Sequence, residues 1–279
     1  MIIDGKKIAQ KIIDDLKSQP KPKKIFAAIL AGENGSASSP QVRASISFLK
    51  QKEKIGKELG IDFRIYKFPE EIKNDDLRKE VGKIALLKPV GGVIVQLPLP
   101  SHLNRHYILN VIPREKDVDV LGEKALGAFY TGRNPVLPPA VGVVEEILQN
   151  TRYKIQDTKV AVVGLGFLTG KPIAIWLMDK AKKISIFKRN SDLSELKEYD
   201  LIISGVGRAD LIRPEMLKEN AGVIDFGYSF NESGKISGDF DDSQLSNVKC
   251  QLSFYTPTPN GTGPILVAKL FENFYKLNV

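Results

Sequence analysis

Apolar runs and helical patterns alternate along the first half of this chain. The run IFAAILA contains no polar residue, whereas DFRIYKF alternates apolar and polar positions as a half-buried strand does. The stretch NDDLRKEVGKIALL has the spacing of a helix, with Asn74 or Asp75 as its expected cap. Strands are expected over 25–31, 62–68 and 91–96, and helices over 42–59 and 74–87. This order predicts a mainly parallel sheet with helices on both faces.

A polar stretch rich in glycine and proline, from Pro113 to Pro139, separates this series from a second one and reads as a junction. The second series predicts four strands with helices between them, over 159–164, 183–188, 200–206 and 221–227, after a helix over 141–150 and before an amphipathic helix over 262–277. We therefore expect two α/β domains, 1–139 and 140–261, with the C-terminal segment 262–279 packing back on the first. A Ser/Gly-rich loop is expected at 32–40.

Length and composition narrow the class of protein. Of the 279 residues, 42% are hydrophobic and 27% charged, as in globular proteins. No apolar run approaches the ~18 residues of a membrane helix, and the first residues lack the long apolar core of a secretory signal. Cys250 is the only cysteine, which fits a reducing compartment, and with only His102 and His106 beside it a zinc site is not expected. We expect a cytoplasmic protein with no metal and no membrane partner.

The net charge of +8 admits three interpretations: a nucleic-acid partner, a solvated basic surface, or a site for small anionic ligands. The lysines are spread over many segments, and no motif interleaves basic and aromatic residues. A dispersed charge gives no defined footprint for a nucleic acid, so none is expected as a partner. The charge alone does not decide between the other two interpretations.

The segment VAVVGLGFLTGKP runs from a predicted strand through three glycines into a predicted helix. Glycines let the backbone approach a phosphate closely, and the free N–H groups at the start of the helix favour negative charge. The spacing is one residue longer than the usual dinucleotide fingerprint, and glycines after a strand also make ordinary turns. The strand–turn–helix context favours a dinucleotide site that includes Gly164, Leu165, Gly166 and Gly170.

The end of the next predicted strand bears on which dinucleotide binds. Lys188 and Arg189 follow it directly, and Asp192 is the first carboxylate after them. A carboxylate at this position suits the free ribose of NAD, whereas positive charge suits the 2′-phosphate of NADP. A solvated basic turn is the alternative, but the pattern favours NADP over NAD. The expected cofactor contacts also include Ser191, Val206 and Gly207.

A single polar residue interrupts the apolar segment VIVQLPLP at 93–100. Burying an unpaired amide costs about 1–3 kcal/mol, so Gln96 either bonds nearby backbone or faces a site. On the helix expected over 42–59, Ser45, Phe48 and Lys52 share one face. By spacing alone, an ordinary amphipathic helix with an exposed lysine is the preferred interpretation, because lysine is abundant in this chain.

Several motifs together resemble a known family, over nearly the whole chain. They are IIDGKKIA (2–9), the helix with Lys52, VIVQLPLP (93–100), PREKDVD (113–119), VVGLGFLTGKP (162–172), VIDFGYSF (223–230) with GKISGDF (234–240), and TPTPNGTGP (256–264). In this order they are similar to the bifunctional methylenetetrahydrofolate dehydrogenase/methenyltetrahydrofolate cyclohydrolase family.

The resemblance implies a role for each of three residues: Lys52 as the active-site lysine, Gln96 as the amide that contacts and tunes it, and Asp119 as the carboxylate that binds the pterin ring. It also implies an N-terminal α/β/α catalytic domain, a Rossmann-like NADP domain, and a homodimer formed through the nucleotide domains. The implied reactions are oxidation of 5,10-methylenetetrahydrofolate and hydrolysis of the methenyl product. Folate contacts are expected at Ser45, Phe48, Pro98, Leu99 and Pro264.

The chain departs from the family pattern at its expected site. Phe48 replaces a tyrosine, Val120 replaces a glycine after KDVD, and Leu165 replaces an arginine in the nucleotide turn. The segments 137–142 and 259–266 differ as well, and the loop 32–44 is longer than usual. Two alternatives to a bifunctional enzyme therefore stand: a dehydrogenase without cyclohydrolase activity or with a shifted substrate, and a catalytically degenerate nucleotide-binding homologue.

Overall fold

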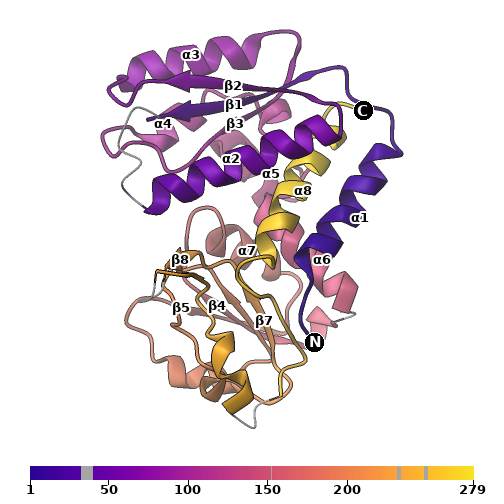
Figure 1. Ribbon diagram of the computed structural model, residues 1–279, viewed down its shortest axis with the longest axis vertical. Helices are drawn as coiled ribbons and strands as arrows, with labels where there is room; N and C mark the ends of the chain where they lie inside the picture. Colours follow the sequence, from indigo (N-terminus) through magenta and orange to yellow (C-terminus); the bar gives the residue numbers. More distant parts are fainter. Residues whose placement is uncertain (33–39, 152, 231–233, 248–250) are drawn as a thin grey trace. The chain divides into compact units, whose positions relative to one another are not determined.

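The computed structural model describes residues 1–32, 40–151, 153–230, 234–247 and 251–279. The chain forms two compact α/β units, each built on a parallel sheet (Figure 1). The three-stranded unit comprises 10–139 and 267–279, and the five-stranded unit comprises 1–9 and 140–266. Among the described residues, no helix has the length and hydropathy to cross a bilayer.

The sheet of the three-stranded unit has the order β2-β1-β3, with all strands parallel. Its strands are β1 (Ile25–Ala31), β2 (Asp62–Phe68) and β3 (Val90–Val95), and the helices that connect them are α2 (Pro40–Glu58) and α3 (Asn74–Leu86). The chain steps from β1 to one neighbour and then crosses to the other. Right-handed crossovers therefore place α2 and α3 on opposite faces of the sheet, as Figure 1 shows.

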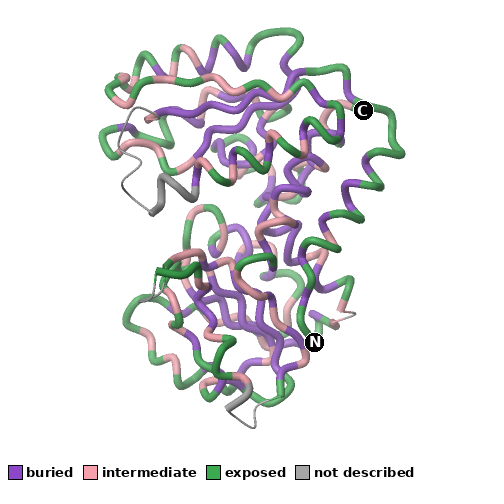
Figure 2. Tube along the Cα trace, in the orientation of Figure 1, coloured by how far each residue is buried: buried purple, intermediate pink, exposed green. Residues whose placement is uncertain are grey.

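Burial in this sheet follows strand position. All seven residues of the central strand β1 are buried, whereas β2 at the edge alternates exposed and half-buried residues (Figure 2). Phe26 of β1 stacks on Phe274 at 4.7 Å between ring centroids and meets Phe271 edge-on at 5.3 Å. Both partners lie on α8 (Thr262–Lys276), so the C-terminal end of that helix forms part of this core.

The sheet of the five-stranded unit has the order β10-β7-β6-β4-β5 and is also parallel. Its strands are β4 (Lys159–Val163), β5 (Lys183–Phe187), β6 (Leu201–Ser204), β7 (Gly222–Asp225) and β10 (Phe254–Tyr255). The chain moves from β4 outward to β5 and then back across to β6. The carboxyl ends of β4 and β6 therefore flank a topological switch point, where open α/β sheets bind ligands.

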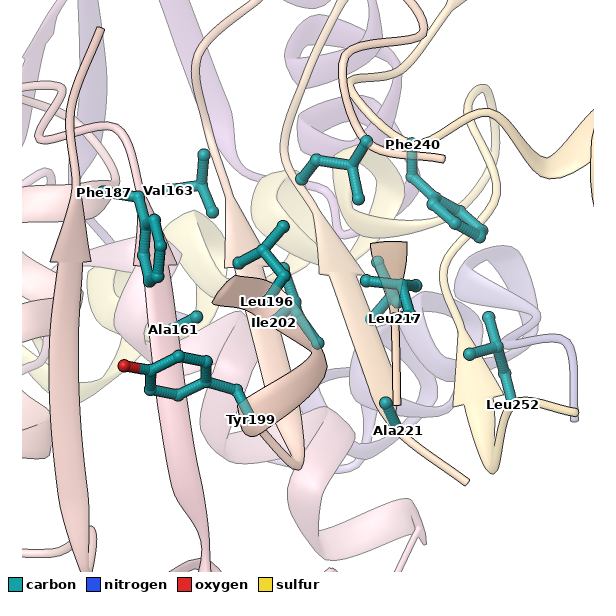
Figure 3. Packing of buried hydrophobic residues seen from close by; sticks show 12 residues of the cluster. Ala161, Val163, Phe187, Leu196, Tyr199, Ile202, Leu217, Ala221, Phe240 and Leu252 are labelled. Carbon is teal, nitrogen blue, oxygen red and sulfur yellow. The ribbon is translucent and has the colours of Figure 1, made fainter. Parts of the chain in front are cut away.

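One face of this sheet packs as a continuous apolar cluster. Ala161 and Val163 of β4 and Ile202 of β6 face Leu196 and Leu217 from the connecting segments (Figure 3). The other members are Phe187, Tyr199, Ile212, Ala221, Val223, Phe240 and Leu252. This packing fixes the strand ends that carry the loops of the switch point.

The remaining elements connect these sheets or extend from them. The helices are α1 (Gly5–Lys17), α4 (Arg105–Leu109), α5 (Glu123–Tyr130), α6 (Pro139–Thr151) and α7 (Gly170–Leu177). A short antiparallel hairpin pairs β8 (Ser229–Phe230) with β9 (Ile236–Ser237). The 3₁₀ turns are η1 (Arg114–Lys116), η2 (Ile155–Asp157), η3 (Leu193–Glu198), η4 (Pro214–Met216) and η5 (Asp242–Asn247).

The structure corrects three sequence predictions. The N-cap of α3 is Lys73 rather than Asn74 or Asp75, because the Asn74 amide instead bonds the main chain of His102 and Asn104. The expected junction 113–139 contains the helix α5, which buries Ala125 and Phe129 one turn apart. The segments between β5 and β6 and between β6 and β7 form only the short turns η3 and η4 instead of full helices. The expected loop at 32–40 lies mostly outside the described residues.

Candidate active site

Lys52 lies on α2 and is buried, with only 7% of its surface exposed. Its Nζ donates a hydrogen bond of 2.9 Å to Oε1 of Gln96. An ammonium group in this setting loses most of its hydration, and a neutral amide compensates less for that loss than a carboxylate would. The lysine is therefore held in place by a partner that does not stabilise its charge strongly.

Gln96 follows directly after β3, and its amide bonds both nearby backbone and the Lys52 amine. Its backbone N–H donates to Ile29 O at 2.8 Å, which extends the pairing of β3 with β1 by one residue. Its side-chain Nε2 donates to Leu97 O at 3.1 Å, and its Oε1 accepts from Lys52. The side-chain nitrogen of Gln96 thus bonds the backbone and its side-chain oxygen bonds Lys52, and these two hydrogen bonds fix the orientation of the amide.

Asp119 supplies the charge that opposes Lys52. Burial lowers the pKa of Lys52, and the negative charge of Asp119 acts in the opposite direction. Burial likewise raises the pKa of Asp119, against the positive charge of Lys52. Desolvation is the larger effect in both cases, so both groups are shifted toward their neutral forms. A lysine shifted in this way can exchange a proton closer to neutral pH than its ordinary pKa of about 10.4 allows.

The other predicted folate contacts of this unit border the same cluster. Ser45 is buried, and its Oγ donates to Leu97 O at 3.2 Å, the carbonyl that also accepts from Gln96. Phe48 is half-buried on α2, Pro98 is exposed and Leu99 is half-buried. The structure thus brings Ser45, Lys52 and Gln96 to one place at the end of β3. Pro264 belongs to the five-stranded unit, and its folate contact stays a prediction.

The predicted nucleotide turn lies at the switch point of the five-stranded sheet. Gly164 follows β4 with φ +85°, a conformation that glycine adopts without strain. A Cβ at Gly170 would lie 1.8 Å from the carbonyl oxygen of Gly164, so only glycine fits where the turn meets α7. The first turn of α7 contains no acidic residue. This close turn and the uncapped helix start fit the pyrophosphate of a dinucleotide.

The residues after β5 are arranged around a tight turn. The Lys188 N–H donates to Ser191 Oγ at 2.8 Å, and the Ser191 N–H donates back to Lys188 O at 3.0 Å. The Asp192 carboxylate accepts the Ser194 N–H at 2.9 Å as the cap of η3, and this hydrogen bond lowers its pKa. Lys188 and Arg189 are both exposed. The chemistry of this turn therefore fits a phosphate better than a free ribose hydroxyl.

The loop after β6 is organised by a residue that sequence reasoning missed. Val206 and Gly207 were expected to contact the cofactor, and the structure places Val206 beside Gly164: a Cβ built on Gly164 would lie 3.0 Å from the Val206 side chain. The buried Asp239 carboxylate accepts the N–H groups of Val206, Gly207 and Arg208 at 2.7–2.9 Å. It also accepts the Ser204 hydroxyl at 2.6 Å. The motif GKISGDF contains this aspartate, but its partners are more than thirty residues away along the chain.

A second missed residue, Asp117, lies two positions before Asp119. It is 1% exposed, and its carboxylate bonds two backbone N–H groups of the following turn. Its place as the first aspartate of KDVD was no usable signal, because its backbone partners cannot be recognised from the sequence. Across the described ranges, no group of three histidine, cysteine, aspartate or glutamate side chains is placed to hold a metal ion.

Comparison with known proteins covers both units. The profile described as tetrahydrofolate dehydrogenase/cyclohydrolase, catalytic domain, matches residues 3–119, and the one described as its NAD(P)-binding domain matches residues 138–278. The chain is 32% identical over 283 residues to Bifunctional protein FolD of Mycoplasma mobile, covering 99% of this chain and 96% of that protein. It is 33% identical over 281 residues to Bifunctional protein FolD of Clostridium botulinum, covering 98% and 95%.

Solved structures agree with this assignment. The bifunctional FolD methylenetetrahydrofolate dehydrogenase/cyclohydrolase of Campylobacter jejuni matches with a TM-score of 0.90 and 31% identity, covering 100% of this chain and 98% of that chain. The Trypanosoma brucei enzyme, solved with NADP and an inhibitor, matches with a TM-score of 0.88 over 99% of this chain and 96% of that one. At 24% identity the second match shows the fold alone. The chain belongs to the tetrahydrofolate dehydrogenase/cyclohydrolase family.

Proposed function

We propose that Lys52, Gln96 and Asp119 perform the folate chemistry of this protein and that Lys188 and Arg189 select its cofactor. The protein is an NADP-dependent methylenetetrahydrofolate dehydrogenase and methenyltetrahydrofolate cyclohydrolase of one-carbon metabolism. The observation that carries the assignment of roles is the buried hydrogen bond of 2.9 Å between Lys52 Nζ and Gln96 Oε1, beside the carboxylate of Asp119.

In the oxidation step, the chain's residues mainly hold the substrate. The Asp119 carboxylate accepts hydrogen bonds from the paired donors of the pterin ring, and the ring of Phe48 stacks on it. Bound NADP supplies the acceptor for the hydride that leaves the methylene carbon of the folate. Positioning of two reactants contributes a large part of such a rate enhancement, so this step depends little on proton transfer by the protein.

In the hydrolysis step, water adds to the methenyl carbon and the bond from that carbon to N5 opens. One proton of the water ends on N5 of the product, and the other is released. Lys52, whose pKa burial lowers, accepts the proton from the attacking water and returns it as the ring opens. Gln96 keeps the amine aimed at this position without raising its pKa as strongly as a carboxylate would.

Cofactor selectivity is assigned to the turn after β5. The exposed cations Lys188 and Arg189 hold the 2′-phosphate of NADP, and the Ser191 hydroxyl lies within the same turn. Leu165 stands where the family has an arginine, so these two cations compensate for the missing charge. Gly164, Gly166 and Gly170 receive the pyrophosphate at the start of α7.

Three further expectations belong to this proposal. The protein is a homodimer formed through its five-stranded units, as the family resemblance implies. It acts in the cytoplasm. Residues 1–139, with the helix at 262–279, form the catalytic domain and residues 140–261 form the dinucleotide domain. A crosslinking or light-scattering measurement of the purified protein tests the dimer, since a monomeric mass at micromolar concentration would overturn it.

The test of the function is a dual-wavelength assay with methylenetetrahydrofolate and either NADP or NAD. Reduced nicotinamide reports the oxidation, and methenyl absorbance reports the intermediate. We expect reduced nicotinamide to form faster with NADP, and methenyl absorbance to decay only when Lys52 is intact. Formation of reduced nicotinamide without any consumption of the methenyl compound would reduce the function to the dehydrogenase alone.

A further inference from the structure

The turn that carries Asp119 contains a residue in an unfavourable conformation. Val120 has φ +57°, in the left-handed region that glycine adopts freely but β-branched residues avoid. Its side chain is fully buried, so Val120 is part of the packed interior and not of a surface loop. A residue stays in such a conformation only when its surroundings hold it there. The family pattern has glycine at this position, whereas this chain must stabilise a valine.

Asp117 supplies the restraint. One oxygen of its carboxylate, Oδ2, accepts the N–H groups of Leu121 at 2.9 Å and Gly122 at 2.7 Å. Its main-chain oxygen accepts the Val120 N–H at 3.3 Å. Three consecutive N–H groups, from residues 120 to 122, therefore point back at one residue. These three hydrogen bonds close the turn around Val120 and restrain its backbone conformation.

Asp117 is itself held firmly. It forms a parallel bridge with Val93 of β3, so it is fixed to the strand that ends at Gln96. On the other side, Gly122 allows the close approach of the carboxylate, since a Cβ there would lie 3.2 Å from Asp117 Oδ2. Burial raises the pKa of Asp117 to about 7, and the charge of Asp119 adds to this, while the bonded N–H groups act against it.

The neighbouring residues are tethered in the same way. Asn273 of α8 donates from Nδ2 to Val118 O at 2.9 Å and to Leu137 O at 2.8 Å. The Lys116 Nζ donates to the carbonyl oxygens of Ala85 and Leu87 at the end of α3. The backbone on the N-terminal side of Asp119 is thus anchored at Lys116, Asp117 and Val118. Beyond Asp119, its course depends on the conformation of Val120.

We propose that Asp117 is a positioning residue whose carboxylate holds Val120 in the left-handed conformation and thereby directs Asp119 toward Lys52. This inference rests on the roles proposed above for Lys52 and Asp119. It explains how a valine is held in this conformation: the hydrogen bonds to Asp117 restrain the turn in which Val120 lies. Asp117 acts through the geometry of Asp119 and not by contact with the substrate.

The test compares Asp117→Ala with Asp117→Asn, each alone and combined with Val120→Gly. Alanine removes the acceptor, so we expect kcat/KM for methenyltetrahydrofolate hydrolysis to fall at least tenfold while KM for NADP stays within twofold. Asparagine keeps an oxygen at the same position and should retain most of the activity. Glycine adopts φ +57° without strain, so Val120→Gly should restore much of the loss in the Asp117→Ala protein.

Two controls separate positioning from a general loss of stability. Val81→Ala removes a fully buried side chain of α3 in the same unit and should lower Tm without changing either KM. In an Asp119→Asn background, Asp117→Ala should cause no further fall in kcat/KM, because the two residues act through one group. If Asp117→Ala fails to fold, recovery of a folded, active protein in Asp117→Ala/Val120→Gly supports the proposal, and failure of that double variant to fold overturns it.

Several results would overturn the inference. These are wild-type kcat/KM in folded Asp117→Ala, an equal loss of folate and NADP affinity, an additive loss in the Asp119→Asn background, or no rescue by Val120→Gly in any background. The proposed function fails separately, when Lys52→Met and Asp119→Asn both hydrolyse the substrate at the parental rate. If those two variants lose activity and Asp117→Ala does not, only the positioning role is wrong.

Discussion

Replacing Lys52 with methionine keeps most of the side chain's length and removes its amine. Gln96 Oε1 then loses its donor, which costs about 1–3 kcal/mol of stability for a buried acceptor. Burying the amine also has a desolvation cost, and methionine removes that cost. The two effects on the free energy of unfolding have opposite signs, so we expect the variant to fold with a modest change in Tm. Asp119 loses its nearby positive charge, and its pKa rises further.

The effect on catalysis should be much larger than the effect on stability. General acid–base catalysis is typically worth about 10²–10⁴-fold, or about 3–5 kcal/mol of the barrier. We therefore expect hydrolysis of methenyltetrahydrofolate, followed by the loss of methenyl absorbance, to fall by at least 10². Hydride transfer, which depends mainly on positioning, should fall far less.

Lys50→Met is the matched control, because Lys50 lies on the same helix two residues earlier and is exposed. Its hydrolysis rate should stay within twofold of the parent. The reasoning is refuted if Lys52→Met, folded and able to bind the folate, hydrolyses the substrate at the parental rate. A parallel loss in Lys50→Met would indicate that the net charge of α2, and not the amine at Lys52, controls the reaction.

Three further predictions follow from the same geometry. Changing Lys188 and Arg189 together to alanine should raise KM for NADP at least tenfold and leave KM for NAD nearly unchanged. An equal rise of both KM values would mean that the two cations contribute to the overall electrostatic potential or to folding and not to recognition of the 2′-phosphate. Phe48 lacks the family's tyrosine hydroxyl, so methenyltetrahydrofolate should accumulate during turnover, and Phe48→Tyr should raise hydrolysis more than hydride transfer; an unchanged ratio of the two rates would count against this. Burial and the charge of Asp239 raise the pKa of Asp225 to about 7, so its stabilising protonated form is complete below pH ~4 and is lost as the pH rises through 7. Asp225→Asn should therefore flatten the fall of Tm between pH 4 and 8, and an unaltered slope would show that another group titrates.

Strand positions could be predicted from the sequence because a strand buried on both faces requires an uninterrupted apolar run, whereas an edge strand shows alternation. IFAAILA and DFRIYKF became β1 and β2 with the predicted boundaries, since central and edge strands impose different patterns. The helix α5 was missed because glycine and proline around it outweigh a short pattern of eight residues. The cap of α3 was missed because a tertiary contact uses the Asn74 side chain.

The residues of the site divide in a similar way. Lys52 was indistinguishable from an exposed lysine by spacing, and only the family resemblance singled it out before the structure showed it buried against Gln96. Asp117 and Asp239 gave no usable signal, because each acts by accepting backbone N–H groups. The conformation of Val120 was equally hidden: its sequence shows a departure from glycine, but only the backbone shows why glycine belongs there.

The most direct measurement is the titration of the Lys52 amine by NMR of ¹³C- or ¹⁵N-labelled lysine, with Lys52→Met to assign the signal. Burial should bring its pKa clearly below the ordinary value of about 10.4, and the same pKa should appear in the pH profile of hydrolysis. Because Asp119 acts to raise this pKa, Asp119→Asn should lower it further. A Lys52 amine that titrates at or above the ordinary value, or that does not respond to Asp119→Asn, would contradict its role as the proton-exchanging group.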